Sequence, residues 1–322
     1  MKLRVLSGED VRASLGMREA IAAMREAFGQ LSAGLARVPV RLRLEAEAGV
    51  TLFMPAYLDR TQDLGAKIVS FYPNNPQRGL PAISALVLVL DSQTGLPTAL
   101  MEAGYLTALR TGAASGLATD LLARREASVV AIFGAGAQAP AQIEAVCAVR
   151  PIREVRIVAR RRESADRLAK QIEGVDVRIL DDRSAALAGA DIVIAATTSS
   201  TPVFDGHDVE PGTHINGIGS YTPEMQEVDA TVVQRARIVV DSREAALKEA
   251  GDLIIPIQQG LIRAEDVDTE LGEIVNGIKA GRTSDSEITF FKSVGVAVQD
   301  VAVARRVLQA AASREGISVV DL

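Results

Sequence analysis

A glycine-rich turn between an apolar run and a helical run carries the clearest chemistry in this chain. Residues 128–133 form an apolar strand, and Gly134, Gly136 and Ala139 follow it with the spacing of a dinucleotide-binding fingerprint. Gly134 permits the tight turn, Gly136 lets the backbone approach a pyrophosphate, and the small Ala139 lets the helix pack closely on the strand. The phosphates would lie at the positive end of the helix dipole, so the turn predicts a bound dinucleotide.

Three cationic residues earlier in the chain, Arg41, Lys67 and Arg110, stand at unusual places. Lys67 interrupts the apolar strand 64–69, and Arg110 opens a helical segment of small residues. A buried charge is unfavourable without a partner, and the carboxylate of a substrate would supply one. An internal salt bridge, or a side chain that reaches solvent at a sheet edge, explains each cation equally well. The residues alone leave both interpretations open.

The elements around the glycine-rich turn predict its setting. The following strands and helices are expected at 154–158, 164–172, 175–180, 184–188 and 190–196, with a later strand at 214–218. This alternation predicts an α/β domain with a Rossmann-type, doubly wound parallel sheet, whose ligands lie beyond the carboxyl ends of the strands. Thr197 and Thr198 follow one such end, and Gly219 follows another.

The end of the second strand bears on the choice of cofactor. An acidic residue normally holds the ribose hydroxyls of NAD there, whereas this chain has Arg160, Arg161 and Arg162. Guanidinium groups suit the additional phosphate of NADP through charge-assisted contacts. A solvated run of charge at the start of a helix is the alternative. The sequence therefore favours NADP(H) and keeps NAD(H) as the alternative.

The first part of the chain has a different pattern of predicted elements, with most of its strands following one another directly. It predicts a second, α+β domain that binds the substrate. An amphipathic helix is expected at 17–31 and another helix at 105–123, with strands at 38–44, 51–57, 64–71, 82–91 and 97–101. We expect a mixed or antiparallel sheet here. The predicted domains are a substrate domain at 1–118 and a nucleotide-binding domain at 119–298.

Composition excludes several classes of protein. The 322 residues carry a formal charge of −6, and no basic face interleaved with aromatic residues is present, so a nucleic-acid partner is not expected. We also expect no signal peptide and no membrane span, and hence a cytoplasmic protein. His207 and His214 lack ligand spacing, so no metal site is expected, and His214 is interpreted as a hydrogen-bonded structural residue.

Several motifs together resemble the ornithine cyclodeaminase/μ-crystallin family over essentially the whole chain. They lie at 67–69, 73–75, 106–114, 134–139, 214–219, 281–289 and 291–295, and at Gln299 and Asp300. The resemblance implies a homodimer in which the amino-terminal substrate domain forms the interface, and a carboxy-terminal segment, 299–322, that returns to this domain. It also implies that Arg41, Lys67 and Arg110 surround the carboxylate of an amino or imino acid.

The glycine-rich turn and the arginine run predict the contacts on the phosphate and ribose side, namely Gly134, Gly136, Ala137, Gln138, Arg160 and Arg161. The resemblance implies those on the nicotinamide side, which would be lined by Thr197, Thr198, Asn216, Gly219, Ser293, Val294 and Gly295.

Two departures from the cyclodeaminase pattern favour one activity within the family. Cyclodeaminases carry an acid/base aspartate shortly after the strand that ends near Gly219, where this chain has Ser220 and Tyr221. They also place a glutamate two residues before a Met-Pro pair, where this chain has Leu52. We therefore expect an oxidoreductase that reduces a cyclic ketimine, Δ1-pyrroline-2-carboxylate or Δ1-piperideine-2-carboxylate, to L-proline or L-pipecolate.

In this hypothesis Arg41 and Arg110 bind the carboxylate, and Lys67 both binds it and relays a proton to the imine nitrogen. Three alternatives remain at the level of the sequence. The first is ornithine cyclodeamination. The second is an alanine dehydrogenase-type activity on amino acids or acyclic imines. The third is a ligand-binding protein of the crystallin kind that retains NADP without turnover.

Overall fold

The computed structural model describes residues 2–322, which form two compact units. Unit 1 comprises the described residues up to Arg110 together with Val296–Leu322, and unit 2 comprises Thr111–Gly295. The division falls within helix α3 (Gly104–Leu122), which contributes residues to both units. The predicted boundaries, 118/119 and 298/299, lie a few residues further along the chain.

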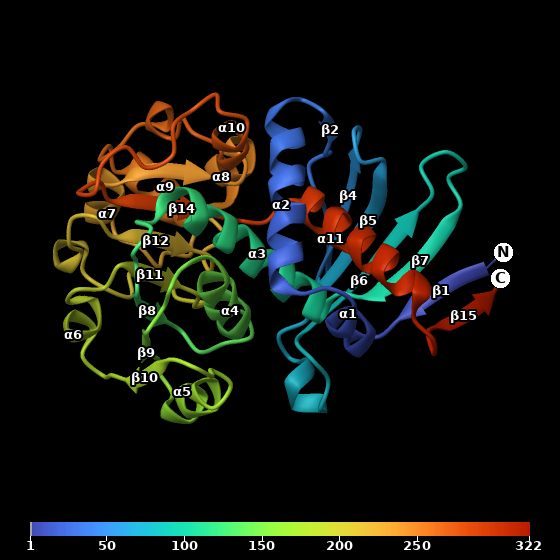
Figure 1. Cartoon of the computed structure of the whole chain (residues 1–322), viewed down its shortest axis with the longest axis horizontal. Helices are drawn as coiled ribbons and strands as arrows, with labels where there is room; N and C mark the ends of the chain where they lie inside the picture. Colours follow the sequence, from blue (N-terminus) through green and yellow to red (C-terminus); the bar gives the residue numbers. More distant parts are fainter. Residues whose placement is uncertain (1) are drawn as a thin grey trace. The chain divides into compact units, whose positions relative to one another are not determined.

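Unit 2 is built on a parallel seven-stranded sheet in the order β10-β9-β8-β11-β12-β14-β13 (Figure 1). This confirms the predicted doubly wound α/β fold. Its further elements are β8 (Val129–Phe133), α4 (Ala139–Val149), β9 (Glu154–Val158), α5 (Arg162–Ala169), β10 (Asp176–Ile179), α6 (Arg183–Leu187), β11 (Ile192–Ala195), η2 (Gly206–Asp208), β12 (His214–Gly217), α7 (Ala230–Arg235), β13 (Arg237–Val240), α8 (Arg243–Glu249), α9 (Gly251–Gln258), η3 (Ala264–Asp266), α10 (Leu271–Val275) and β14 (Thr289–Lys292).

Helices cover both faces of this sheet, which explains why its central strands are apolar throughout. In β8, Val130 and Ile132 pack into a core with α4 and α5, whereas Ala131 and Phe133 pack into a second core with α6 to α9. Successive side chains of a strand point to opposite faces, so a strand covered on both sides needs an unbroken apolar run. The run that precedes the glycine-rich turn is therefore dictated by the two layers of helices.

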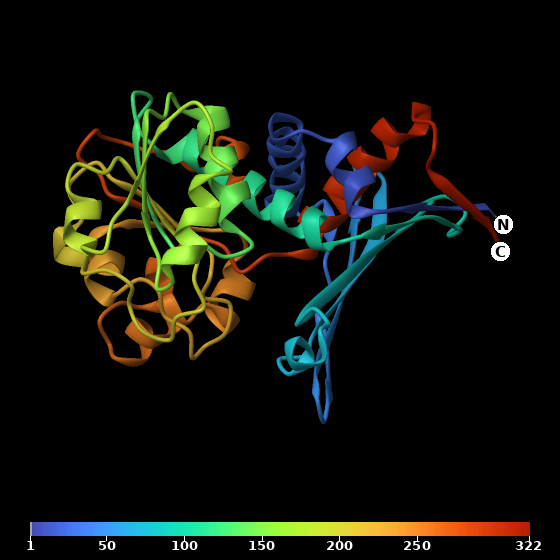
Figure 2. The same cartoon turned by 90° about the horizontal axis from the view of Figure 1, so that it is seen from below.

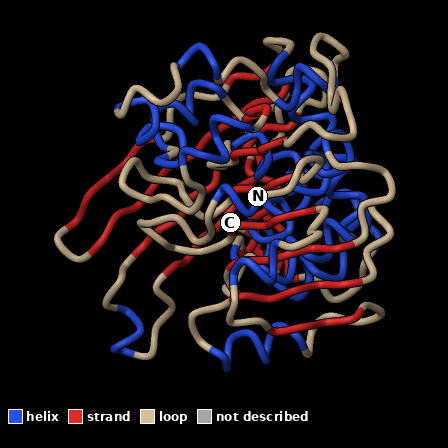
Figure 3. Tube along the Cα trace, turned by 90° about the vertical axis from the view of Figure 1, so that its left-hand side faces the viewer, coloured by secondary structure: helices blue, strands red, loops and turns tan. Residues whose placement is uncertain are grey.

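Unit 1 contains a mixed eight-stranded sheet in the order β15-β1-β7-β6-β5-β4-β2, with β3 also paired to β4. All its pairs are antiparallel except β1 with β7. Figure 3 traces the chain with its strands in red. Its elements are β1 (Lys2–Leu6), α1 (Gly8–Ser14), α2 (Met17–Ser32), β2 (Ala36–Arg37), β3 (Leu42–Ala46), β4 (Gly49–Leu58), β5 (Asp63–Phe71), η1 (Asn75–Arg78), β6 (Ile83–Leu90), β7 (Pro97–Glu102), α11 (Ala297–Ala310), η4 (Ala311–Ser313) and β15 (Ser318–Asp321).

The two faces of the unit 1 sheet have different surroundings. Helix α11 packs on β4, β5 and β6 over the face that carries Lys67. Ile68 points to the opposite face, where its direct neighbours across the strands are Phe53 and Leu86. The β3–β4 hairpin and the η1 turn extend from the body of this unit (Figure 2).

The structure corrects several predicted elements. Of the strand expected at 38–44, only residues 42–44 form a strand, as part of β3; β2 ends at Arg37, and Pro39 in the gap lacks the N–H that a continuous ladder needs. Strands β1 and β15 were not predicted, and they pair with each other at the edge of the unit 1 sheet. None of the helices within residues 2–322 combines the length and apolar character that crossing a bilayer requires.

Candidate functional site

The glycine-rich turn has the geometry that its sequence predicts. Gly134 has φ +105°, and a Cβ there would lie 2.4 Å from the carbonyl oxygen of Ala196. Only glycine tolerates both this backbone conformation and this approach. A Cβ on Gly136, in contrast, would meet no atom within 4 Å, so the space above this residue is open.

The start of α4 presents several hydrogen-bonding groups without partners. Among residues 2–322, no acceptor receives the backbone N–H of Gly136, Ala137 or Gln138. The side-chain Oε1 of Gln138 is also buried without a partner. Unpaired N–H groups at the start of an eleven-residue helix form a site for an anion. These groups fit the pyrophosphate of a dinucleotide.

The arginines after β9 differ in their contacts. Arg160 and Arg161 are exposed and have no ion pair or side-chain hydrogen bond with another described residue. Arg162 begins α5 and pairs with Asp166 through Nε at 3.2 Å. Two guanidinium groups therefore remain for a ligand at this strand end, next to the glycine-rich turn after β8.

The carboxyl ends of β11 and β12 are joined by Glu227, a residue that the sequence prediction did not include. Its carboxylate accepts hydrogen bonds from the backbone N–H groups of Thr197 and Gly219. Burial raises the pKa of Glu227, and the charge of Lys292 opposes this rise. Thr198 lies at the same edge with its side chain exposed.

Asn216 lies inside β12 and is fully buried. Its Nδ2 donates to Thr119 Oγ1 at 3.0 Å, and its Oδ1 lies 3.2 Å from His214 Nε2. His214 Nδ1 lies 2.9 Å from Thr289 Oγ1, which confirms the structural interpretation of this histidine. Burial lowers the pKa of His214 to about 3, so its ring is neutral at ordinary pH.

The turn of Ser293, Val294 and Gly295 after β14 is held by Asp241. One carboxylate oxygen, Oδ2, accepts from Ser293 Oγ at 2.8 Å, Val294 N at 3.0 Å and Gly295 N at 2.7 Å. Asp241 is fully buried, and burial raises the pKa of its carboxyl. The donors of this turn are thus occupied within the chain.

In unit 1 the structure joins two of the predicted cations through one carboxylate. Lys67 Nζ lies 2.9 Å from Asp300 Oδ2, and Arg110 Nε lies 3.1 Å from Asp300 Oδ1. Gln299 Oε1 accepts from Arg110 as well as from the backbone N–H of Val296. Gln299 Nε2 is buried and donates to no described residue. Lys67 and Arg110 are 2 % and 7 % exposed, and Asp300 is fully buried.

The third predicted cation, Arg41, also affects the pKa of Lys67. Burial lowers the pKa of Lys67 to about 8, the charges of Arg110 and Arg41 lower it too, and Asp300 opposes them. Arg41, just before β3, is therefore near Lys67. Lys67 and Arg110 together carry one positive charge more than Asp300 neutralises. The internal salt bridge and the carboxylate clamp that the sequence left open are therefore compatible.

Sequence reasoning did not assign a role to Asp300, Glu227 or Asp241. Asp300 could have been found, because it stands in the apolar helix segment from Val296 to Val303. Its position in the first turn of α11 also favours a negative charge. Glu227 and Asp241 give no comparable signal, since acidic residues in loops are ordinarily solvated.

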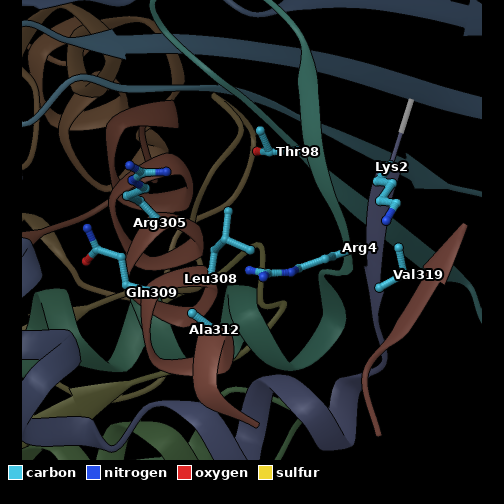
Figure 4. A pocket seen from close by; sticks show the side chains of 8 residues that line it. All are labelled: Lys2, Arg4, Thr98, Arg305, Leu308, Gln309, Ala312 and Val319. Atoms are coloured by element: carbon cyan, nitrogen blue, oxygen red, sulfur yellow. The ribbon is translucent and has the colours of Figure 1, made fainter. Parts of the chain in front are cut away.

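A hollow of about 510 Å³ lies in unit 1 beside α11 (Figure 4). It is lined by Lys2, Arg4, Thr98, Arg305, Leu308, Gln309, Ala312 and Val319. Arg305, one of its cations, already interacts electrostatically with Asp63 and Asp91. None of the predicted site residues lines this hollow, so it does not bear on their chemistry.

Comparison with known proteins places the chain among imine and amino-acid oxidoreductases. A model of the ornithine cyclodeaminase/mu-crystallin family matches residues 1–315. A Δ1-pyrroline-2-carboxylate reductase of Bacillus cereus is 42 % identical over 316 residues, which is 96 % of this chain and 97 % of that protein.

Two solved structures superpose closely on the chain. Thermococcus litoralis Δ1-pyrroline-2-carboxylate reductase, in complex with NADH and L-proline, has a TM-score of 0.94 at 39 % identity and covers 99 % of this chain and 100 % of its own. An archaeal alanine dehydrogenase dimer with bound NAD has a TM-score of 0.94 at 39 % identity and covers 100 % of both chains.

Proposed function

Because the chain belongs to the ornithine cyclodeaminase/mu-crystallin family, we infer that it is an NAD(P)H-dependent reductase of a cyclic ketimine amino acid. Its substrate is Δ1-pyrroline-2-carboxylate or the six-membered Δ1-piperideine-2-carboxylate, and its product is L-proline or L-pipecolate. Two relatives with this reductase activity in their names, at 42 % and 39 % identity, support the reaction. The observation that carries it is the buried cluster of Lys67, Arg110 and Asp300.

The cluster has the properties that a carboxylate substrate requires. Its excess positive charge attracts an anion, and Arg110 and Arg41 supply guanidinium groups for its two oxygens. Gln299 Nε2, which is buried and donates to no described residue, adds a neutral donor beside Arg110. We propose that Arg41 and Arg110 bind the substrate carboxylate while Asp300 and Gln299 hold Arg110 in orientation.

The cofactor contacts follow from the free groups of unit 2. The N–H groups at residues 136–138 hold the pyrophosphate, and Arg160 and Arg161 hold the ribose with its additional phosphate. The residues proposed for the nicotinamide side are Thr197, Thr198, Asn216, Gly219 and the turn 293–295. When bound, the reduced nicotinamide supplies the hydride for the imine carbon.

Lys67 is the proposed proton donor to the imine nitrogen. With a pKa of about 8 it is largely protonated at neutral pH, yet acidic enough to give up a proton. Asp300 contacts Lys67 directly, so it stabilises the ammonium form before transfer and orients it. Arg110 remains a cation throughout and can only bind.

A dehydrogenase that deaminates alanine is the second candidate, because an archaeal alanine dehydrogenase has the same TM-score as the reductase. The cyclodeaminase alternative lacks its acid/base aspartate, since Ser220 and Tyr221 stand there. The reductase is therefore the function that the chain supports best.

The test of this function is reductant consumption with matched substrates. We expect rapid oxidation of NADPH or NADH with one of the two cyclic ketimines, and slow oxidation with pyruvate and ammonia. The variant Arg110→Met should lower kcat/KM roughly thirty-fold, because the loss of a charged hydrogen bond to the carboxylate weakens transition-state binding by about 2 kcal/mol. Arg18→Met, an exposed arginine of α2, is the control. Faster turnover with pyruvate and ammonia would favour the dehydrogenase instead.

The pH profile tests the role of Lys67. Because burial places its pKa near 8, kcat/KM for ketimine reduction should fall as the pH rises through about 8 and Lys67 loses its proton. In Asp300→Asn the carboxylate that raises this pKa is gone, so the falling limb should move to lower pH by roughly one unit or more. A falling limb that stays in place in Asp300→Asn would show that another group titrates.

Cofactor preference is the finer part of the proposal, and we propose NADP(H). The double variant Arg160→Ser/Arg161→Ser should bind NADPH about ten- to a hundred-fold more weakly and NADH within about twofold, because only NADPH has the phosphate that these guanidinium groups contact. Calorimetric titration measures both. Arg162→Ser is the matched control, since Arg162 already pairs with Asp166. The proposal requires that the double variant lose more affinity for NADPH than for NADH. Equal losses, or no loss, would favour NAD(H).

We also propose that the protein is a homodimer through the sheet of unit 1. Leu42, Phe53, Ile68 and Leu86 are successive neighbours in register on the face opposite α11. Leu42, Ile68 and Leu86 are 64 %, 39 % and 45 % exposed. An exposed apolar row of this kind is typical of a protein interface, and the archaeal alanine dehydrogenase is a dimer.

Sedimentation analysis tests this interface. Leu86→Glu introduces a charge into the row, so this variant should sediment as a monomer under conditions where the unmodified protein is a dimer. Ile278→Glu changes an equally apolar residue of unit 2 that is 65 % exposed and should leave the dimer intact. Dimerisation that survives Leu86→Glu would place the interface elsewhere.

A further inference from the structure

A single buried carboxylate in unit 2 connects the loops that follow two neighbouring strands. Glu227 is fully buried, and its Oε1 accepts from the backbone N–H of Thr197 at 2.5 Å. Its Oε2 accepts from the N–H groups of Gly219 at 2.5 Å and Ser220 at 3.0 Å. Thr197 follows β11 and Gly219 follows β12, which are adjacent in the sheet. Because each of these hydrogen bonds is directional, this side chain fixes the spacing of two strand ends.

A second buried pair holds Glu227 in place. Asp252 Oδ1 accepts from the backbone N–H groups of Glu227 at 2.6 Å and Val228 at 3.0 Å. Asp252 Oδ2 lies 2.9 Å from Lys292 Nζ, and both side chains are fully buried. Lys292 is the last residue of β14, the strand beside β12. The network therefore extends to a third strand end.

The backbone around Glu227 is packed so closely that a small change would displace it. A Cβ on Gly219 would lie 2.0 Å from the carbonyl oxygen of Thr197 and 2.6 Å from both carboxylate oxygens of Glu227. Real Cβ atoms do not approach backbone oxygens so closely, so the loops would have to separate. The spacing of the loops after β11 and β12 is thus set by two independent features, the carboxylate and the missing side chain.

Stability alone does not account for this arrangement. Burying charged groups is unfavourable, and a buried ion pair is often replaced by apolar residues of similar volume without loss of stability. What the network provides that apolar packing would not is a directional bond from one side chain to three specific N–H groups. This directionality lies at the strand ends where ligands of a doubly wound sheet bind.

We propose that Glu227 is the positioning residue for the nicotinamide half of the cofactor. This inference rests on the proposed function, in which Thr197 and Gly219 line that half. Glu227 acts through these two loops. The phosphate and adenosine half depends on the turn after β8 and on the arginines after β9, none of which Glu227 contacts. A disturbance at Glu227 should therefore weaken one half of the binding site and spare the other.

A comparison of two ligands tests this separation. The variant Glu227→Gln leaves one acceptor oxygen and turns an NH2 group toward backbone N–H donors, so the loops must move apart. We expect its affinity for the reduced cofactor to fall about tenfold or more, because buried donors lose their acceptor. Its affinity for ADP-ribose, or for the 2′-phosphorylated form if NADPH is preferred, should stay within about twofold of the unmodified protein. Calorimetry measures both without turnover.

Gly219→Ala is the second variant, and it separates the same loops without changing charge. It should give the same difference between the two ligands, and it carries the test if Glu227→Gln does not fold. Glu224→Gln is the matched control, because Glu224 is an exposed carboxylate of the same loop. This control should bind both ligands normally.

Two results would overturn the assignment. Equal loss of both ligands in Glu227→Gln and Gly219→Ala, with a lowered unfolding temperature, would make Glu227 a purely structural residue. Unchanged binding of both ligands would mean that the loop spacing does not matter. If the unmodified protein binds neither ligand, the proposed function itself fails, and this outcome is distinguishable because it needs no variant.

Discussion

The buried carboxylate of Asp300 is the interaction on which the chemistry of unit 1 depends. Lys67 and Arg110 are almost completely withdrawn from water, and two neighbouring cations in such a place repel each other. Asp300 offsets one of the two charges, and the first turn of α11 stabilises its own negative charge. The cluster that remains is fixed in position and still positive, which suits a small anionic substrate.

Unit 2 uses carboxylates in another way. Glu227, Asp241 and Asp252 accept mainly from backbone N–H groups and thereby fix loops at the carboxyl ends of neighbouring strands. Among residues 2–322, the turn after β8 keeps the backbone N–H groups of Gly136, Ala137 and Gln138 without an acceptor. The sheet edge therefore combines loops that the chain satisfies internally with one that it leaves open.

Local patterns were enough to predict the nucleotide-binding sheet, because its apolar strands and glycine-rich turn depend on neighbours close in the sequence. The edge strands β1 and β15 could not be predicted, since they pair across almost the full length of the chain. Lys67 and Arg110 could be identified from the sequence, because each is a charged residue in a segment of apolar or small residues. Their partner Asp300 lies 233 residues after Lys67, and no local pattern encodes that distance. The family resemblance suggested what Lys67 and Arg110 bind, and the structure shows that Asp300 is their partner within the chain.

The apolar row on the open face of the unit 1 sheet has a consequence for folding. In the proposed dimer, residues such as Leu42 and Leu86 become buried against the second copy, so part of the hydrophobic free energy of this unit would come from association. Folding and assembly are then linked by mass action. The temperature at which the protein unfolds should accordingly rise with its concentration, and dilute protein should be the more susceptible to proteolysis in the β3–β4 hairpin.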